Sequence, residues 1–224
     1  MTIKASDVIA RLTPTLHDIA KVRWPDSEHW QAITDAENAI LEARPDLFDV
    51  TEDVQFQVFG PKQPVPNDCF MLFDVTHNLN DQKVPVSGIT KVERSMMDRV
   101  LRDWMAEAND TRVEHWMQDE RERDFFWVYP GVGEDPATSQ PGWVVMRYAR
   151  RPVKIVASTD NLTVPDELMN AVYYFAMTRL LEKDEKFAGS PQAKMFLEKF
   201  ALVVGARTEG EGQEDAASDE REGV

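Results

Sequence analysis

The sequence predicts an α+β fold, with terminal helices that form a helical bundle and a β-rich middle of antiparallel strands with a hairpin extension. Three observations carry this prediction. Apolar residues recur at helical spacing in the first 45 residues and again in residues 165–204. Between these stretches, short segments alternate apolar and polar residues, as half-buried strands do, and Gly and Pro separate them. Neither a repeat nor a domain linker is visible, so residues 1–206 are expected to form a single domain.

Two helices are expected near the N-terminus, at residues 6–20 and 26–43. Pro14 lies within the apolar run of the first helix and should kink or shorten it, because proline lacks the N–H that a helix interior needs. Asp26 or Ser27 is placed to cap the second helix, since both side chains accept hydrogen bonds from the first turn.

The middle of the chain contains two β-rich stretches, residues 54–92 and 113–156. The strands expected within them cover residues 54–59, 70–77, 113–118, 125–129 and 143–148. Residues 60–66 are interpreted as a rigid connection rich in proline, and residues 131–142 as a hairpin tip or a mobile loop. A short helix is expected at residues 93–104, with four residues turned inward: Met96, Met97, Val100 and Leu101.

Two further helices are expected near residues 165–187 and 191–204. The first is apolar almost all round, which is typical of a helix covered on several sides, by its own domain or by a neighbouring subunit. The second has a narrow apolar stripe and should pack on one side only, and Gly205 is a helix stop signal. Residues 207–224 hold seven acids and two arginines and are expected to form a disordered acidic tail.

The composition excludes some classes of function. The chain has 224 residues and a formal net charge of −15, so it is not expected to hold nucleic acid through the phosphates. DNA that passes beside an acidic wall is repelled and can slide. No apolar run approaches the ~20 residues that span a bilayer. A single cysteine and the lack of an apolar leader favour an intracellular, reducing setting.

No motif with recognisable chemistry stands out. His115 with Asp119 and Glu120 could be written as a metal cluster, but a strand that leads into a turn would scatter these side chains. Cys69 is interpreted as a small buried residue rather than as a nucleophile. The glycines of residues 131–133 lack the strand–turn–helix context of a phosphate-binding loop. We therefore expect no catalysis, no cofactor and no metal.

Several segments nevertheless stand in a recognisable order. They are Val22-Arg23-Trp24-Pro25-Asp26-Ser27-Glu28, Ala43-Arg44-Pro45-Asp46, Pro64-Val65-Pro66-Asn67-Asp68, Val113-Glu114-His115-Trp116, Phe126-Trp127-Val128-Tyr129-Pro130 and Tyr173-Tyr174-Phe175-Ala176. Together, over about residues 5–206, they resemble the head–tail adaptor (connector) proteins of tailed phages, a family similar to the tail tubular protein A of podophages.

The resemblance implies a structural virion protein that is not an enzyme, made in the host cytoplasm and located at the neck, the head–tail junction. Such adaptors form a ring, commonly of twelve copies, below the portal. The helical bundle and terminal segments are expected to contact the portal protein, and the β-rich part a tail tube or nozzle protein. DNA passes through the channel without sequence-specific binding, and no membrane is involved.

The residues expected at a subunit or portal interface are Tyr173, Tyr174, Phe175, Met177, Leu181 and Arg207. Three alternatives stay open at this point. The chain could be another neck or capsid-associated protein, such as a stopper, completion or decoration protein. It could be a small cytoplasmic hydrolase with a pocket in the β-rich middle. It could also be an acidic DNA mimic that acts through residues 207–224.

Overall fold

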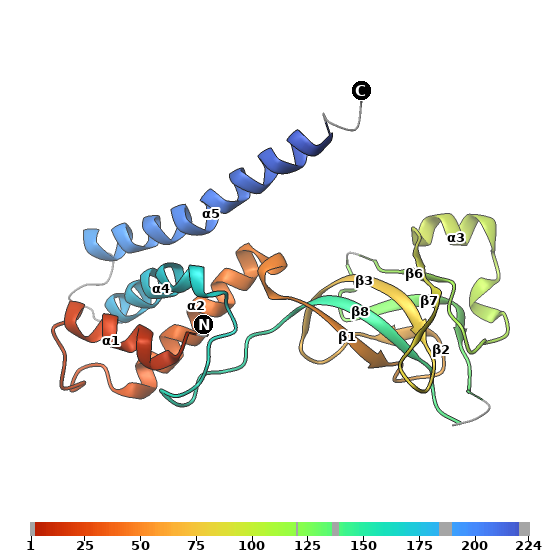
Figure 1. Ribbon diagram of the computed structural model, residues 1–224, viewed down its shortest axis with the longest axis horizontal. Helices are drawn as coiled ribbons and strands as arrows, with labels where there is room; N and C mark the ends of the chain where they lie inside the picture. Colours follow the sequence, from red (N-terminus) through yellow and green to blue (C-terminus); the bar gives the residue numbers. More distant parts are fainter. Residues whose placement is uncertain (1–2, 120, 136–138, 184–189, 220–224) are drawn as a thin grey trace. The chain divides into compact units, whose positions relative to one another are not determined.

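The computed structural model describes residues 3–119, 121–135, 139–183 and 190–219, with the backbone alone for residues 206–219. The α+β fold class is confirmed. The chain divides into two compact units, and the expectation of a single domain over residues 1–206 stays a prediction. We call residues 1–48 with 151–224 the helical unit, and Asp49–Arg150 the β unit (Figure 1).

The helical unit is built around α4 (Met169–Glu182). Three helices contact it, namely α1 (Ala5–Thr15), α2 (Asp26–Ala43) and α5 (Pro191–Asp219), and Figure 1 shows them gathered around α4. The residues that α4 buries include Ala171, Val172, Ala176, Met177 and Leu180. A helix that is apolar nearly all round is stable only with such cover on several sides. Short 3-10 turns, η1 (Pro45–Phe48) and η3 (Asp166–Leu168), follow α2 and precede α4.

α1 ends at Thr15, earlier than the expected end near residue 20. Pro14 occupies its last turn and weakens it, because proline cannot donate to the carbonyl four residues earlier and its ring crowds that carbonyl. Beyond it, His17 and Lys21 adopt positive φ angles of 54° and 52°. Such left-handed residues turn the chain out of the helix.

α5 continues to Asp219, past the stop that we expected at Gly205. A glycine ends a helix when it adopts a left-handed conformation, and Gly205 does not. Inside a helix, glycine costs about 1 kcal/mol relative to alanine but does not forbid the structure. The disorder expected for residues 207–224 in the free protein stays a prediction.

The β unit is a sandwich of two four-stranded sheets. One sheet has the order β1 (Asp49–Gln55), β8 (Trp143–Arg150), β3 (Cys69–Leu79), β4 (Pro85–Gly88). The other has the order β2 (Gly60–Pro64), β7 (Phe125–Val132), β6 (His115–Met117), β5 (Thr90–Lys91). Neighbouring strands are antiparallel except β5 and β6. Residues from both sheets form one core, including Leu72, Val75, Trp116, Phe126, Val128 and Met146.

Three strands that the sequence did not predict are all at sheet edges. β2 had been interpreted as a proline-rich connection, and β4 and β5 are short and exposed. An edge strand pairs on one side only, so it tolerates the prolines at positions 61 and 64 of β2. Local patterns therefore identify such strands poorly, because neither alternation nor β-propensity is required of them.

The first strand lies earlier than expected. β1 covers Asp49–Gln55 instead of residues 54–59. Two of its acidic residues are paired across the sheet with arginines of β8, since Asp49 contacts Arg147 and Glu52 contacts Arg150. The alternating residues 56–59 instead form an irregular loop.

The short helix is also smaller than expected. α3 spans Arg94–Val100, and of the four residues expected to face inward only Met97 is fully buried. Met97 packs with Trp104, of the 3-10 turn η2 (Trp104–Ala106), and with Met117. Met96 and Val100 are 55% and 68% exposed. A helix of fewer than two turns presents only a small part of its surface to the sheet beside it.

Candidate assembly interface of the helical unit

The seam between α4 and α5 is aromatic. The ring of Phe196 lies 6.0 Å from that of Tyr173 and 6.1 Å from that of Tyr174, and the ring of Phe200 lies 4.9 Å from that of Phe175. Aromatic pairs attract one another at these separations. The stripe that α5 buries consists of Ala193, Phe196, Phe200 and Val204. Leu197 and Ala201, which border this stripe, are exposed.

The structure places the expected interface residues at different depths. Met177 and Leu181 are core residues, 0% and 4% exposed. Tyr173, Tyr174 and Phe175 are half-buried and lie against the phenylalanines of α5. Much of the cover that the apolar character of α4 requires is thus supplied by the helical unit itself. The side chain of Arg207 lies outside the described residues.

α5 exposes a second apolar surface away from this stripe. Met195 and Leu202 are 39% and 70% exposed, whereas Leu197, which is 45% exposed, borders the buried stripe. Met195 and Leu202 are seven residues apart, so they lie on the same side of the helix. Single exposed apolar residues are ordinary, but a cluster on one helix indicates an interaction surface. We call Met195 and Leu202 the outer α5 patch; in the sequence, their place outside the apolar stripe was the signal of it.

α5 is also longer than α4, the helix that it packs on. It has 29 residues, whereas α4 has 14. The two helices are antiparallel, because Thr178 donates a hydrogen bond to the carbonyl of Ala193 while Tyr174 lies against Phe196. At this register α5 passes the start of α4 close to Val203, and Figure 1 shows it projecting beyond α4. From there to Asp219, the backbone of α5 extends past the start of α4.

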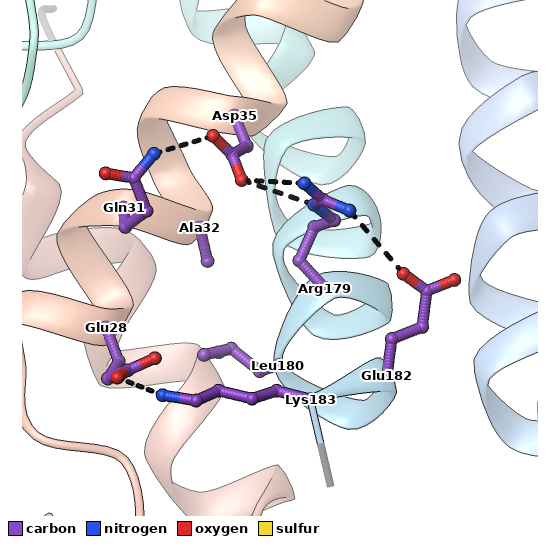
Figure 2. A pocket seen from close by; sticks show the side chains of 8 residues that line it. All are labelled: Glu28, Gln31, Ala32, Asp35, Arg179, Leu180, Glu182 and Lys183. Carbon is purple, nitrogen blue, oxygen red and sulfur yellow. Dashed lines mark hydrogen bonds and ion pairs between the residues drawn. The ribbon is translucent and has the colours of Figure 1, made fainter. Parts of the chain in front are cut away.

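A polar pocket of about 360 Å³ lies between α2 and α4 (Figure 2). Ion pairs between the two helices line it: Arg179 lies 3.2 Å from Asp35, and Lys183 contacts Glu28. The lining holds three carboxylates and two cations. Because all these groups are partly exposed, each pair adds little to stability. The pocket offers charged contacts to a partner.

The loop between α1 and α2 is anchored on α4 by Trp24. This side chain is 5% exposed, and its indole N–H donates to the carbonyl of Leu180 at 3.1 Å. Asp18 holds the loop from within, because its carboxylate accepts the backbone N–H groups of Val22, Arg23 and Trp24 at 2.9 to 3.0 Å. These bonds, that from Trp24 above all, lower the pKa of Asp18. The segment that carried part of the family resemblance is therefore a structural anchor.

A buried carboxyl group ties the segment before α4 to α2. Glu37 is 0% exposed, and its Oε1 accepts the N–H groups of Thr163 at 2.6 Å and Val164 at 3.3 Å. Its Oε2 has no hydrogen-bond partner among the described residues. Burial raises the pKa of Glu37 to about 7. One turn away, the Thr34 hydroxyl accepts the N–H of Ile155 at 3.2 Å. These contacts set where α4 begins.

The residues considered for chemistry do not come together. His115 stacks on Tyr129 with ring centroids 6.3 Å apart, and Asp119 accepts the backbone N–H two residues on. Cys69 is buried, and Glu120 lies outside the described residues. Within the part of the chain that the structure describes, no group of His, Cys, Asp and Glu could hold a metal ion. Nor does any helix of that part combine the length and the apolar character needed to cross a membrane.

The helical unit thus has exposed apolar and charged surfaces that are suited to contacts with other proteins. A comparison with known families shows to which kind of protein the chain belongs. The model of the family described as SU10 adaptor protein matches residues 3–221, which include both units. The chain belongs to the SU10 adaptor protein family. This confirms the resemblance to phage adaptors, and the protein is a structural adaptor of a phage virion. No curated protein matches the chain.

In an adaptor the functional site is a surface that meets other proteins. Membership of the SU10 adaptor family implies a place at the virion neck and contacts with portal and tail proteins. On the helical unit of this adaptor, the features suited to such contacts are the outer α5 patch, the part of α5 that runs past α4, and the charged pocket of Figure 2.

Proposed function

We propose that this adaptor joins the head of a tailed phage to its tail as a ring of copies below the portal, with DNA passing through the channel. The helical unit contacts the portal and the β unit contacts a tail tube or nozzle protein. The family match over nearly the whole chain supports the role, and the exposed apolar surface of α5 supports assembly.

The proposed contact between subunits, or with the portal, is the outer α5 patch. In the proposed interface this patch takes the place of Met177 and Leu181, because these two side chains are buried in the core of the helical unit. Tyr173, Tyr174 and Phe175 contribute their exposed edges, and Arg207 lies on the part of α5 that continues past α4. A ring needs head-to-tail contacts, in which one surface of each copy meets a different surface of the next. The charged pocket between α2 and α4 offers such a second surface.

Charge shapes how such a ring assembles. Twelve copies would carry roughly −180 in all, because each chain carries −15. Like-charge repulsion opposes ring closure in the free protein, so the ring closes on the portal and is favoured by salt. The same charge lets DNA leave without being held, because an acidic wall repels the phosphates.

Mass measurement of the purified adaptor, alone and with purified portal, tests the proposal. We expect a defined complex with several adaptor copies per portal. Replacing Met195 and Leu202 together by aspartate should abolish this complex, whereas Val22→Asp, at a side chain 84% exposed on the α1–α2 loop, should leave it intact. An adaptor that stays monomeric and does not bind portal contradicts the proposal. Electron microscopy of the particle separates an adaptor from a stopper, completion or decoration protein by position.

A further inference from the structure

The β unit has an end that lies away from both connections to the rest of the chain. The chain enters at Asp49 and leaves at Arg150, at one end of the paired strands β1 and β8. At the other end of the same sheet, Gln55, Trp143 and Leu79 lie side by side on β1, β8 and β3. We call this second end the distal end. The seven residues of β1 put roughly 23 Å between the two ends.

The loops that leave the distal end expose apolar side chains. Val58 and Phe59, just beyond β1, are 43% and 53% exposed. Val84, in the turn after β3, is 52% exposed. In the same turn as Val84, Lys83 places its ammonium group over the ring of Trp143 at 4.4 Å. A connection that served only to reverse the chain would be polar, so apolar side chains gathered at one end of a sandwich indicate a contact surface.

The first of these loops is held in one conformation. The amide of Gln63 is buried and donates to the carbonyls of Val58 at 2.9 Å and Gly60 at 2.8 Å. Gly60 adopts a φ of 101°, which only glycine adopts without strain. Phe56 is anchored in the core. The loop therefore presents Val58 and Phe59 in a fixed position, which reduces the ordering entropy lost when a partner binds.

A pocket at the same end suits a cationic side chain. It has a volume of about 190 Å³, and its lining includes Gln55, Asp81, Asp135 and Trp143. Carboxylates and an aromatic face are the groups that attract a Lys or Arg side chain, through ion pairing and cation–π contact. The fold already shows this preference, since Lys83 lies over Trp143.

The charge of the β unit decides between possible occupants. Asp49–Arg150 hold 18 acidic and 11 basic residues, so a second copy of the same end would be repelled, as would nucleic acid. We propose that the distal end docks a different virion protein, which presents apolar side chains to Val58, Phe59 and Val84 and a Lys or Arg to the pocket. The inference rests on the proposed function, because it takes the partner to be the protein on the tail side.

The test is binding of the full-length adaptor to the purified tail tube or nozzle protein of the same phage. Phe59→Ser and Asp81→Lys should each weaken binding by about tenfold or more, and the loss for Asp81→Lys should shrink as salt is raised. Two matched variants should bind as the wild type does: Phe125→Ser, at an aromatic 39% exposed at the other end of the β unit, and Glu42→Lys, which makes the same charge change on α2. Binding to the portal should be unchanged in all four.

Other outcomes overturn the inference. The inference is wrong if both distal variants bind the tail protein as tightly as the wild type does. It is also wrong if the wild type binds portal but no tail protein. The ring proposal would survive either result. A marked loss of thermal stability in Phe59→Ser would show that the chain itself covers this side chain. Loss of the portal-bound ring in the distal variants alone would show that a second copy occupies the surface. A wild type that binds neither portal nor tail protein contradicts the proposed function.

Discussion

At the residue scale, irregular parts of both units are held by side chains with two or more backbone partners. Asp18 fixes the α1–α2 loop and Gln63 fixes the loop after β1. Asn78, on β3, donates to the carbonyl of Val113 at 2.7 Å and accepts its N–H at 3.0 Å. Such side chains give irregular segments the hydrogen bonds that paired strands give one another in a sheet. They satisfy backbone groups that burial would otherwise leave without a partner.

Replacing Asn78 by alanine should therefore destabilise the β unit by about 2–4 kcal/mol, because it leaves both backbone groups of Val113 buried without a partner. Urea unfolding followed by tryptophan fluorescence measures this. Ser87→Ala is the matched control, since it removes only the hydroxyl that accepts the second bond from the Asn78 amide. Equal losses in the two variants would contradict this account.

Replacing Glu37 by glutamine should stabilise the helical unit at pH 8 and change it little at pH 5. Burial raises the pKa of Glu37 from 4.5 to about 7 in the folded state. The stability of the unit is then greatest below the unfolded-state pKa and falls as pH rises through 7, by roughly 3 kcal/mol in all. Glutamine keeps an acceptor for Thr163 and Val164 without a charge.

Chemical denaturation at the two pH values, followed by circular dichroism at 222 nm, measures the difference between wild type and Glu37→Gln. Other titrating groups, including the buried His29 whose pKa burial lowers, are common to both proteins and cancel in this difference. A gain that is the same at pH 5 and pH 8 would show that ionisation of Glu37 is not the cause.

At the element scale, the attachment of α5 depends on its buried stripe. Phe200→Ala removes the ring that lies 4.9 Å from Phe175 and should cost about 2–4 kcal/mol. Backbone amides of α5 should then exchange hydrogen faster than those of α2. Leu202→Ala, at a side chain 70% exposed, should change the stability of the free chain by less than about 0.5 kcal/mol. Unchanged exchange in Phe200→Ala would mean that the aromatic seam does not hold α5.

At the scale of the whole molecule, two cores in one chain predict two unfolding events. Trp104, Trp116, Trp127 and Trp143 lie in the β unit, so fluorescence reports mainly on it, whereas circular dichroism at 222 nm reports mainly on the helical unit. We expect the urea transitions seen by the two probes to differ, and Glu37→Gln at pH 8 to move the circular dichroism transition alone. Coincident transitions that shift together would show that the units unfold as one.

The amino-acid sequence by itself determined the fold class, the helix at residues 26–43, the apolar character of α4 and, through the order of its segments, the adaptor family. These features depend on periodicity and on local order, which a sequence displays directly. It did not determine the edge strands, because a strand paired on one side needs no regular pattern. Nor did it separate the two units, since the chain crosses between them twice, after Phe48 and after Arg150, and no Gly- or Ser-rich stretch marks either crossing.

Only the tertiary structure decided which apolar residues are left for partners. Tyr173 to Leu181 and the outer α5 patch look alike in sequence, since both are apolar residues of helices. Packing separates them, because α5 covers part of α4 and leaves Met195 and Leu202 exposed on its other side. Likewise, the sequence pattern predicts a strand at Val58 and Phe59, whereas in the structure hydrogen bonds from the amide of Gln63 hold this segment as a loop. Burial depends on contacts between distant segments, which no local pattern contains.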